Sequence, residues 1–287
     1  MRRLPNFALI CFLATCSALC IAQELRPPDS ASAGEETTIS TTGSGKATFY
    51  LVGPGVSHKT DVTLGEDIHL TSQDLQTAGR YLAILCSDTC HSASFFVAAA
   101  KPLSISFIVH PSRVPVALND AVSGVAFPFD QYRNLVLTPV NVNFQLTAKD
   151  ATLFTRSVRT QNGIAWFRTT SGKSAGPVRV TASLDDLTAK RALQQVASDP
   201  CNLRITGQRT KIGILVQTEP VHDCAGNVLP DGTIVTFTAT GRDGKDTVDA
   251  PIKQGVARAQ MDSNGPTTIS AASGVVIGNE IRVGSQP

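Results

Sequence analysis

Short runs in which apolar and polar residues alternate recur along the whole chain. The clearest runs cover residues 48–52, 103–109, 140–146, 178–182, 212–216 and 234–239. They are rich in Val, Ile, Thr and Phe, and Gly, Pro, Asn or Asp separates them. Alternation with a period of two, bounded by turn residues, is typical of β-strands with one buried face. The pattern therefore predicts an all-β chain.

One stretch leaves two interpretations open. Residues 183–196 could hold a helical turn, but 187–196 fits a final strand followed by a linker equally well. Outside the N-terminal segment, no other stretch shows a sustained helical period.

The second half of the chain contains an internal repeat. With Asp130 aligned to Asp223, Asn134 falls on Asn227, Val142 on Val235 and Phe144 on Phe237 without a gap. Further on, residues 163–165 match 255–257, and 176–182 match 265–271. A match that persists over most of a module, with only short changes in length, indicates two copies of one unit. We place these copies at 101–197 and 200–287.

The repeated unit resembles a known family. In the segment 223–237, Asp223 is followed by Gly226-Asn227, Pro230 and then Val235-Thr236-Phe237. This order is similar to the signature of bacterial immunoglobulin-like (Big) domains of the invasin/intimin type. The resemblance covers about two thirds of the chain after the N-terminal segment, although Arg133 and Leu137 replace the Gly and the Pro in the earlier copy. It implies tandem Ig-like β-sandwich modules, export, and a structural or adhesive role, but it does not identify a ligand.

The signature residues also have structural explanations of their own. Val235 and Phe237 are two positions apart, so they share one face of a strand and should point into the sandwich. We expect Asp223 to accept hydrogen bonds from backbone amides of its own turn. The alternative is a calcium site built from Asp223, Asp231 and Asp243. It is disfavoured because calcium needs six to eight oxygen ligands, and the sequence has no dense Asp pattern.

The first third of the chain predicts a shorter and atypical Ig-like module at 35–98. Tyr81 stands where Ig domains carry a corner tyrosine, although Cys86 follows it by five residues instead of two. The module could lack a strand or borrow one from its neighbour. Residues 23–34, rich in Pro, Ser, Ala and Glu, predict a flexible leader, and linkers are expected at 98–102 and 197–200.

The N-terminal segment has the layout of a secretory signal peptide. Arg2 and Arg3 precede an apolar run, and small residues stand ahead of a cleavage point after Ala22. An uncleaved anchor is less consistent with the short run, and a lipid anchor at Cys16 would need Thr15 in a position that prefers a small residue. We therefore expect an exported protein, in the periplasm, on the outer surface or outside the cell, with no transmembrane segment in the mature chain.

Export changes the charge and cysteine content. Without Arg2 and Arg3, 23 basic residues balance 23 acidic ones, which argues against nucleic acid or an anionic membrane as a partner. Four cysteines remain, and an even number in an exported chain suggests two disulfides. Two antiparallel strands would bring Cys201 to Cys224, and a hairpin would bring Cys86 to Cys90. Cys86, Cys90 and His91 also resemble a haem c attachment motif with one extra residue.

A disulfide between Cys86 and Cys90 is favoured over haem attachment, because cysteine pairs in exported proteins are normally bridged. No other motif indicates catalysis, a metal site or a cofactor. The five His residues, at positions 58, 69, 91, 110 and 222, form no zinc set, and Ser44 lacks the frame of a nucleophile elbow. Gly43-Ser44-Gly45-Lys46 lacks the spacing of a phosphate-binding loop. Alternation puts Ile164 and Trp166 on one strand face and Ala165 and Phe167 on the other.

Two functional classes remain. The first is a non-catalytic structural, adhesive or protein-binding module. The second is a carbohydrate-binding or accessory module of an exported complex. The partner is thus a protein or a surface glycan. An exposed, coplanar cluster of Trp166, Phe167, Tyr81 and Tyr132 would favour the second class.

Overall fold

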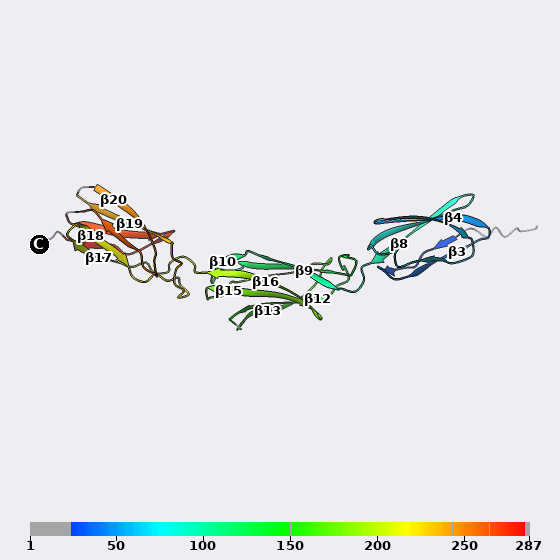
Figure 1. Cartoon of the computed structure of the whole chain (residues 1–287), viewed down its shortest axis with the longest axis horizontal. Helices are drawn as coiled ribbons and strands as arrows, with labels where there is room; N and C mark the ends of the chain where they lie inside the picture. Colours follow the sequence, from blue (N-terminus) through cyan, green and yellow to red (C-terminus); the bar gives the residue numbers. More distant parts are fainter. Residues whose placement is uncertain (1–23, 150, 243, 264, 285–287) are drawn as a thin grey trace, which may run out of the picture. The chain divides into compact units, whose positions relative to one another are not determined.

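The computed structural model describes residues 24–149, 151–242, 244–263 and 265–284 (Figure 1). These residues form strands joined by turns and no helix, which confirms the all-β fold class. None of the described residues belongs to a helix long and apolar enough to cross a membrane. The chain divides into two compact units between Ala100 and Lys101. The signal peptide expected at 1–22, with Cys16, lies outside the described residues.

The first unit holds one β-sandwich, which we call the first module (24–98). Its small sheet has the order β1-β3-β6, and its large sheet has the order β2-β8-β7-β4-β5. The strands are β1 Glu24–Arg26, β2 Ala31–Ser32, β3 Thr37–Thr42, β4 Lys46–Gly53, β5 Val56–Thr63, β6 Ile68–Leu70, β7 Gly79–Cys86 and β8 Cys90–Ala98. Along most of them buried and exposed residues alternate, as the sequence pattern predicts.

The flexible leader expected at 23–34 is a wrong prediction for residues 24–34. β1 pairs with β3, and β2 pairs in parallel with the last residues of β8. Leu25 and Ala33 are buried, because each places its side chain into the sandwich between exposed or half-exposed neighbours. The Pro, Ser and Glu content of this stretch belongs to its turns and outward positions. The first module therefore obtains its first strands from this stretch and is not short.

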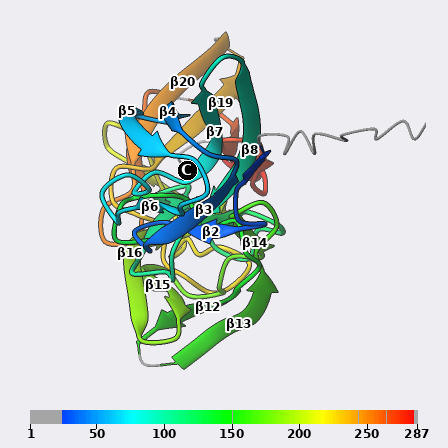
Figure 2. The same ribbon diagram turned by 90° about the vertical axis from the view of Figure 1, so that its right-hand side faces the viewer.

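The second unit begins with a sandwich that we call the second module (101–197). Its small sheet has the order β14-β11-β9, and its large sheet has the order β10-β16-β15-β12-β13. Figure 2 shows four of these strands, β16, β15, β12 and β13, lying side by side. The strands are β9 Ser104–His110, β10 Arg113–Pro115, β11 Val122–Phe129, β12 Asn141–Ala148, β13 Ala151–Arg159, β14 Ala165–Thr169, β15 Gly176–Leu184 and β16 Leu187–Val196.

The stretch 183–196, for which helix and strand were both open, is a strand. Asp185 has a positive φ of 49° in the turn before β16, and β16 then pairs with β15 along its whole length. Asp is among the residues that tolerate this backbone conformation, so the local sequence favours a hairpin.

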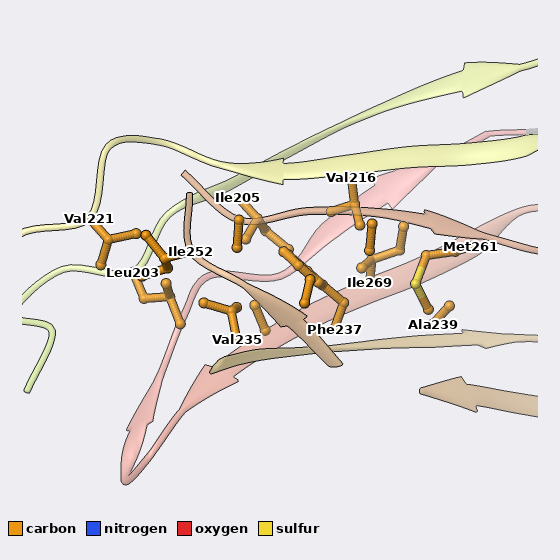
Figure 3. Packing of buried hydrophobic residues seen from close by; sticks show 14 of the residues in the cluster. Leu203, Ile205, Val216, Val221, Val235, Phe237, Ala239, Ile252, Met261 and Ile269 are labelled. Atoms are coloured by element: carbon orange, nitrogen blue, oxygen red, sulfur yellow. The ribbon is translucent and has the colours of Figure 1, made fainter. Parts of the chain in front are cut away.

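The third module (198–284) repeats the arrangement. Its small sheet is β17-β18-β21, and its large sheet is β20-β19-β22-β23, with β24 also paired to β22. The strands are β17 Ile205–Thr210, β18 Gly213–Thr218, β19 Ile234–Gly241, β20 Gly244–Pro251, β21 Arg258–Met261, β22 Thr267–Ser273, β23 Val276–Ile277 and β24 Ile281–Val283. Val235 and Phe237 both point into the core, as expected (Figure 3).

The second and third modules are joined by hydrogen bonds as well as by the chain. The Asn227 side chain donates from Nδ2 to the Lys173 carbonyl at 2.8 Å and accepts from the Ala175 amide at 2.8 Å. Ser198, the first residue after the second module, donates its amide to Asp223 Oδ2 at 3.0 Å and so holds the start of the third module to the same turn. These bonds give a physical reason why 101–287 forms one compact unit, although a linker was expected at 197–200.

Candidate interaction surface

The structure brings Cys86 to Cys90 at the tip of the β7–β8 hairpin. Their Sγ atoms are 2.02 Å apart, and the two residues face each other across the strand pair. His91 is exposed, with Nε2 3.2 Å from Thr89 Oγ1. The two sulfurs that haem attachment would need are therefore bonded to each other.

Cys201 and Cys224 form the second disulfide, with Sγ atoms 2.00 Å apart and Cα atoms 4.6 Å apart. β17 and β18 are antiparallel neighbours, so the segment that precedes β17, with Cys201, and the segment that follows β18, with Cys224, lie at the same end of the module. The Cys201 amide also donates to the His222 carbonyl at 3.0 Å. The disulfide thus ties the entrance of the third module to the turn that follows Asp223.

The Asp223 turn is held by a closed set of hydrogen bonds. Oδ1 accepts from the amides of Ala225 and Asn227 at 2.9 and 2.8 Å, and Oδ2 accepts from Ser198. Burial by itself raises the pKa of the Asp223 carboxyl, but the hydrogen bonds from Asn227, Ser198 and Ala225 outweigh it. The pKa therefore lies below its ordinary value. Asp223 thus accepts hydrogen bonds from the amides of its own turn, as its place in the signature predicts.

The second module repeats this turn. Asp130 Oδ1 accepts from the amides of Tyr132 and Asn134 at 2.9 and 2.8 Å. Arg133, which replaces Gly226, adopts a positive φ of 67°, close to the 84° of the glycine. The backbone of the signature is therefore kept even where its glycine is lost.

The described carboxylates of the alternative calcium site accept hydrogen bonds from backbone amides of the protein. The Asp223 oxygens accept protein amides, and Asp231 Oδ1 accepts from the Gln254 amide at 2.8 Å. Asp243 lies outside the described residues. Among the residues that the structure describes, no group of three or more His, Cys, Asp or Glu could hold a metal ion.

The remaining candidate positions have ordinary structural partners. Gly43 and Gly45, both with positive φ, form the turn between β3 and β4, so this segment opens a strand and not a helix. His58 Nδ1 is 3.8 Å from Asp74 Oδ1, and His222 Nδ1 is 3.1 Å from the Pro220 carbonyl oxygen.

Tyr81 is a corner tyrosine, as its place in the sequence suggests. Its hydroxyl donates to the Thr77 carbonyl, four residues upstream, at 2.9 Å. Its ring is buried beside Phe95. Burial raises the pKa of the Tyr81 phenol, the bond to Thr77 lowers it, and the charge of Asp74 adds to the rise. The net shift is upward.

Trp166 is 62% exposed on β14, whereas its neighbours Ala165 and Phe167 are fully buried. Tyr81 and Phe167 point into cores, and Tyr132 is half-buried. The coplanar aromatic cluster that would favour carbohydrate binding is therefore not formed by these four side chains.

Trp166 belongs to an apolar row that runs across the small sheet of the second module. It pairs with Val125 on β11, which pairs with Ile108 on β9, and Ile108 is 59% exposed. The next outward row is Arg168, Ser123 and His110, which places the cationic Arg168 beside the apolar row. We call Ile108, Val125 and Trp166 the apolar row.

The small sheets of the other modules are polar at the corresponding positions. In the third module Arg258 takes the place of Trp166, and its Nε donates to Gln217 Oε1 at 3.1 Å. In the first module Thr38 pairs with His69. Another exposed apolar group lies on the large sheet of the first module, where Val52 faces Leu82. It lacks a tryptophan.

A cavity of about 570 Å³ opens at one end of the second module. Its described lining includes Lys149, Lys173 and Gln195 but no His, Asp or Glu. Gln195 is buried, and its Nε2 donates to the Ser174 carbonyl at 2.9 Å. The Ser171 hydroxyl in this lining donates to the Pro115 carbonyl at 2.7 Å.

No protein-family model matches the sequence, and neither does any curated protein. Solved structures do match. The solved structure of the Escherichia coli adhesin FdeC superposes with a TM-score of 0.64 at 13% identity, covering 92% of this chain and 97% of the solved FdeC chain. InvD of Yersinia pseudotuberculosis gives 0.53 at 11% identity, covering 92% and 98%. Invasin, a bacterial integrin-binding protein, gives 0.51 at 13% identity, covering 94% and 60%.

At these identities the comparison establishes the fold. The chain is a tandem array of Ig-like β-sandwiches, like those of the bacterial adhesins. The resemblance to bacterial Ig-like domains that the signature residues carry is confirmed at this level.

Proposed function

We propose that the chain is an exported, non-catalytic adhesive or structural protein whose second module binds a protein partner through the apolar row. The observation that carries the proposal is the apolar row, in which Trp166 and Ile108 are exposed on either side of the half-buried Val125, because the corresponding small-sheet positions of the other modules are polar. Export is supported by the N-terminal segment and by the two disulfides. The adhesive role is supported by the shared fold with bacterial adhesins.

The chemistry of the row fits a protein partner better than a sugar. Tryptophan anchors protein interfaces, where it is enriched among the residues that contribute most to binding. Val125 and Ile108 extend the row with aliphatic side chains, which do not stack on sugar rings as an aromatic platform does. The cationic Arg168 stands on the same sheet face, so the partner surface is expected to be apolar at its centre and acidic at its rim.

Adhesion of beads coated with the mature chain tests the proposal. We expect the beads to attach to epithelial or bacterial cells, and attachment to fall after the cells are treated with protease. Trp166→Arg, which installs the residue of the third module, should reduce attachment at least tenfold. Val275→Arg is the matched control, because Val275 is 87% exposed in the third module.

Three results would contradict the proposal. Attachment could be unchanged by Trp166→Arg, or both arginine variants could reduce it equally. Loss with Leu82→Thr but not with Trp166→Arg would assign binding to the first module. A hydrolase panel tests the non-catalytic part, and turnover that one point substitution abolishes would disprove it.

A further inference from the structure

The charge of the chain is distributed unevenly among the modules. Residues 101–197 contain eleven Lys and Arg, five Asp and no Glu. The remainder of the mature chain carries the opposite excess, so the balance of the whole chain conceals a strongly basic second module. Fields of this kind attract anionic partners to one part of a neutral protein.

The positive charge is concentrated on the large sheet of that module. None of its five strands contains an Asp or a Glu. Val142 and Phe144 on β12, and Val178 and Val180 on β15, are buried, so the residues between them face outward. This face is distinct from the apolar row, which lies on the small sheet.

The outward residues are almost entirely polar. We call the following set the polar face: Asn141, Asn143, Gln145, Thr147, Thr155, Ser157, Arg159, Arg179, Thr181, Ser183, Thr188 and Lys190. One row runs Lys190, Thr181, Gln145 and Thr155 across four strands. With strands about 4.8 Å apart, a row of this kind spans about 14 Å.

We infer that the polar face binds an anionic polysaccharide, a glycan chain that carries sulfate or carboxylate groups. Lys190, Arg179 and Arg159 are exposed and would contact the anionic groups. The amides of β12 and the hydroxyls of the neighbouring strands would contact the sugar hydroxyls, since both kinds of group donate and accept hydrogen bonds. The absence of carboxylates in these fully described strands removes the repulsion that an acidic sheet would exert.

Other macromolecules fit this face less well. A stable protein interface needs aromatic or large aliphatic anchors, and the polar face has none. Single-stranded nucleic acid needs aromatic side chains on which bases stack, and these are also lacking. The corresponding sheets of the other modules differ as well. Asp249 on β20 accepts from Thr236 at 2.6 Å, and Asp61 on β5 accepts from Thr48 at 3.2 Å.

Binding of the mature chain to immobilised heparin tests the inference. We expect binding that weakens linearly with the logarithm of salt concentration, because bound cations are released. Arg159→Gln/Arg179→Gln/Lys190→Gln should reduce the affinity at least tenfold and lower the salt slope by about two to three. The matched control is Arg242→Gln/Lys245→Gln/Lys253→Gln, which removes the same charge from exposed positions of the third module. It should change the affinity less than threefold.

Fully desulfated heparin, a DNA duplex and vesicles with anionic lipid complete the experiment. The first should bind much more weakly, and the other two should bind less tightly than heparin. The inference is wrong if the mature chain does not bind heparin or if the control triple loses as much affinity. It is also wrong if DNA or vesicles bind more tightly and lose binding with the same variant. Trp166→Arg should leave heparin binding intact. A negative result with heparin would therefore contradict only the polysaccharide site, and a negative result in the bead assay would contradict only the proposed protein-binding function.

Discussion

The second and third modules share the pairing of their main strands but fill their cores differently. The core of the second module contains Phe107, Phe144 and Phe167, and the last two rings lie 4.8 Å apart. The core of the third module has Phe237 as its single aromatic ring and adds Met261, aliphatic side chains and a disulfide nearby. The small sheets also differ on their outer faces, where an apolar row is replaced by an Arg–Gln pair.

One pair of positions shows how the two cores reach the same fold. In the second module Gly124 faces Phe167 across β11 and β14, and in the third module Val216 faces Ala259 across β18 and β21. A Cβ added to Gly124 would lie 2.4 Å from Phe167 Cε1, so the ring occupies the space above the glycine. Large and small residues have exchanged strands, and close packing is kept.

The largest expected effect on stability comes from substituting Gly124 and Phe167, the facing pair in the core of the second module. Phe167→Ala should reduce the free energy of unfolding of the second module by about 4 kcal/mol, because it leaves a cavity among aromatic rings. Gly124→Val should cost about 2–3 kcal/mol, because the new side chain collides with Phe167. The double variant transplants the Val–Ala pair and should cost at least 2 kcal/mol less than the sum of the two. Urea unfolding followed by hydrogen exchange of peptides from each module measures this, and strict additivity would contradict the exchange argument.

The next largest effect is expected from removing the Cys201–Cys224 disulfide, a cross-link that the third module has and the second module lacks. Cys201→Ser/Cys224→Ser should destabilise the third module by about 3 kcal/mol, because the disulfide closes a long loop in the unfolded chain. Residues 101–197 contain no cysteine, so peptides from the second module should keep most of their protection. Cys86→Ser/Cys90→Ser is the control, since its loop of four residues should contribute less. Non-reducing peptide mapping should recover the Cys201–Cys224 link, and free thiols or a Cys90–Cys201 link would contradict the assignment.

The sequence predicts the repeated parts of this molecule better than the parts that occur once. The repeat with an offset of 93 residues predicts the turns at Asp130 and Asp223, the burial of Val142 and Val235, and the order of the strands. These features are predictable because local alternation and turn residues determine each of them. The strands at 24–34 were missed, since two- and three-residue strands give almost no periodic signal and Leu25 alone marks the buried face. Their pairing with β3 and β8 depends on residues distant in sequence.

The candidate surfaces were harder to predict than the fold. Alternation separates Trp166 from Phe167, but only the pairing of β14 with β11 and β9 shows that Val125 and Ile108 continue its row. The net charge of the whole chain conceals the basic second module, because the acidic first module cancels it. Counting charge separately for each repeat would have shown this asymmetry from the sequence alone.

The smallest expected effect concerns the turn that links the two modules. The pKa of the Asp223 carboxyl is lowered in the folded protein, so its charged form stabilises the fold. That contribution is fully present above the unfolded-state pKa of about 4 and is lost as the pH falls through the lower folded-state pKa. Asp223→Asn keeps the shape but weakens bonds to Ala225, Asn227 and Ser198, and should cost about 1 kcal/mol at pH 7. The loss should shrink as the pH approaches 3, because the wild-type carboxylate is then increasingly protonated. Urea titrations of both proteins between pH 7 and pH 3 measure the difference, and a loss that is independent of pH would show that the charge of Asp223 does not hold this turn.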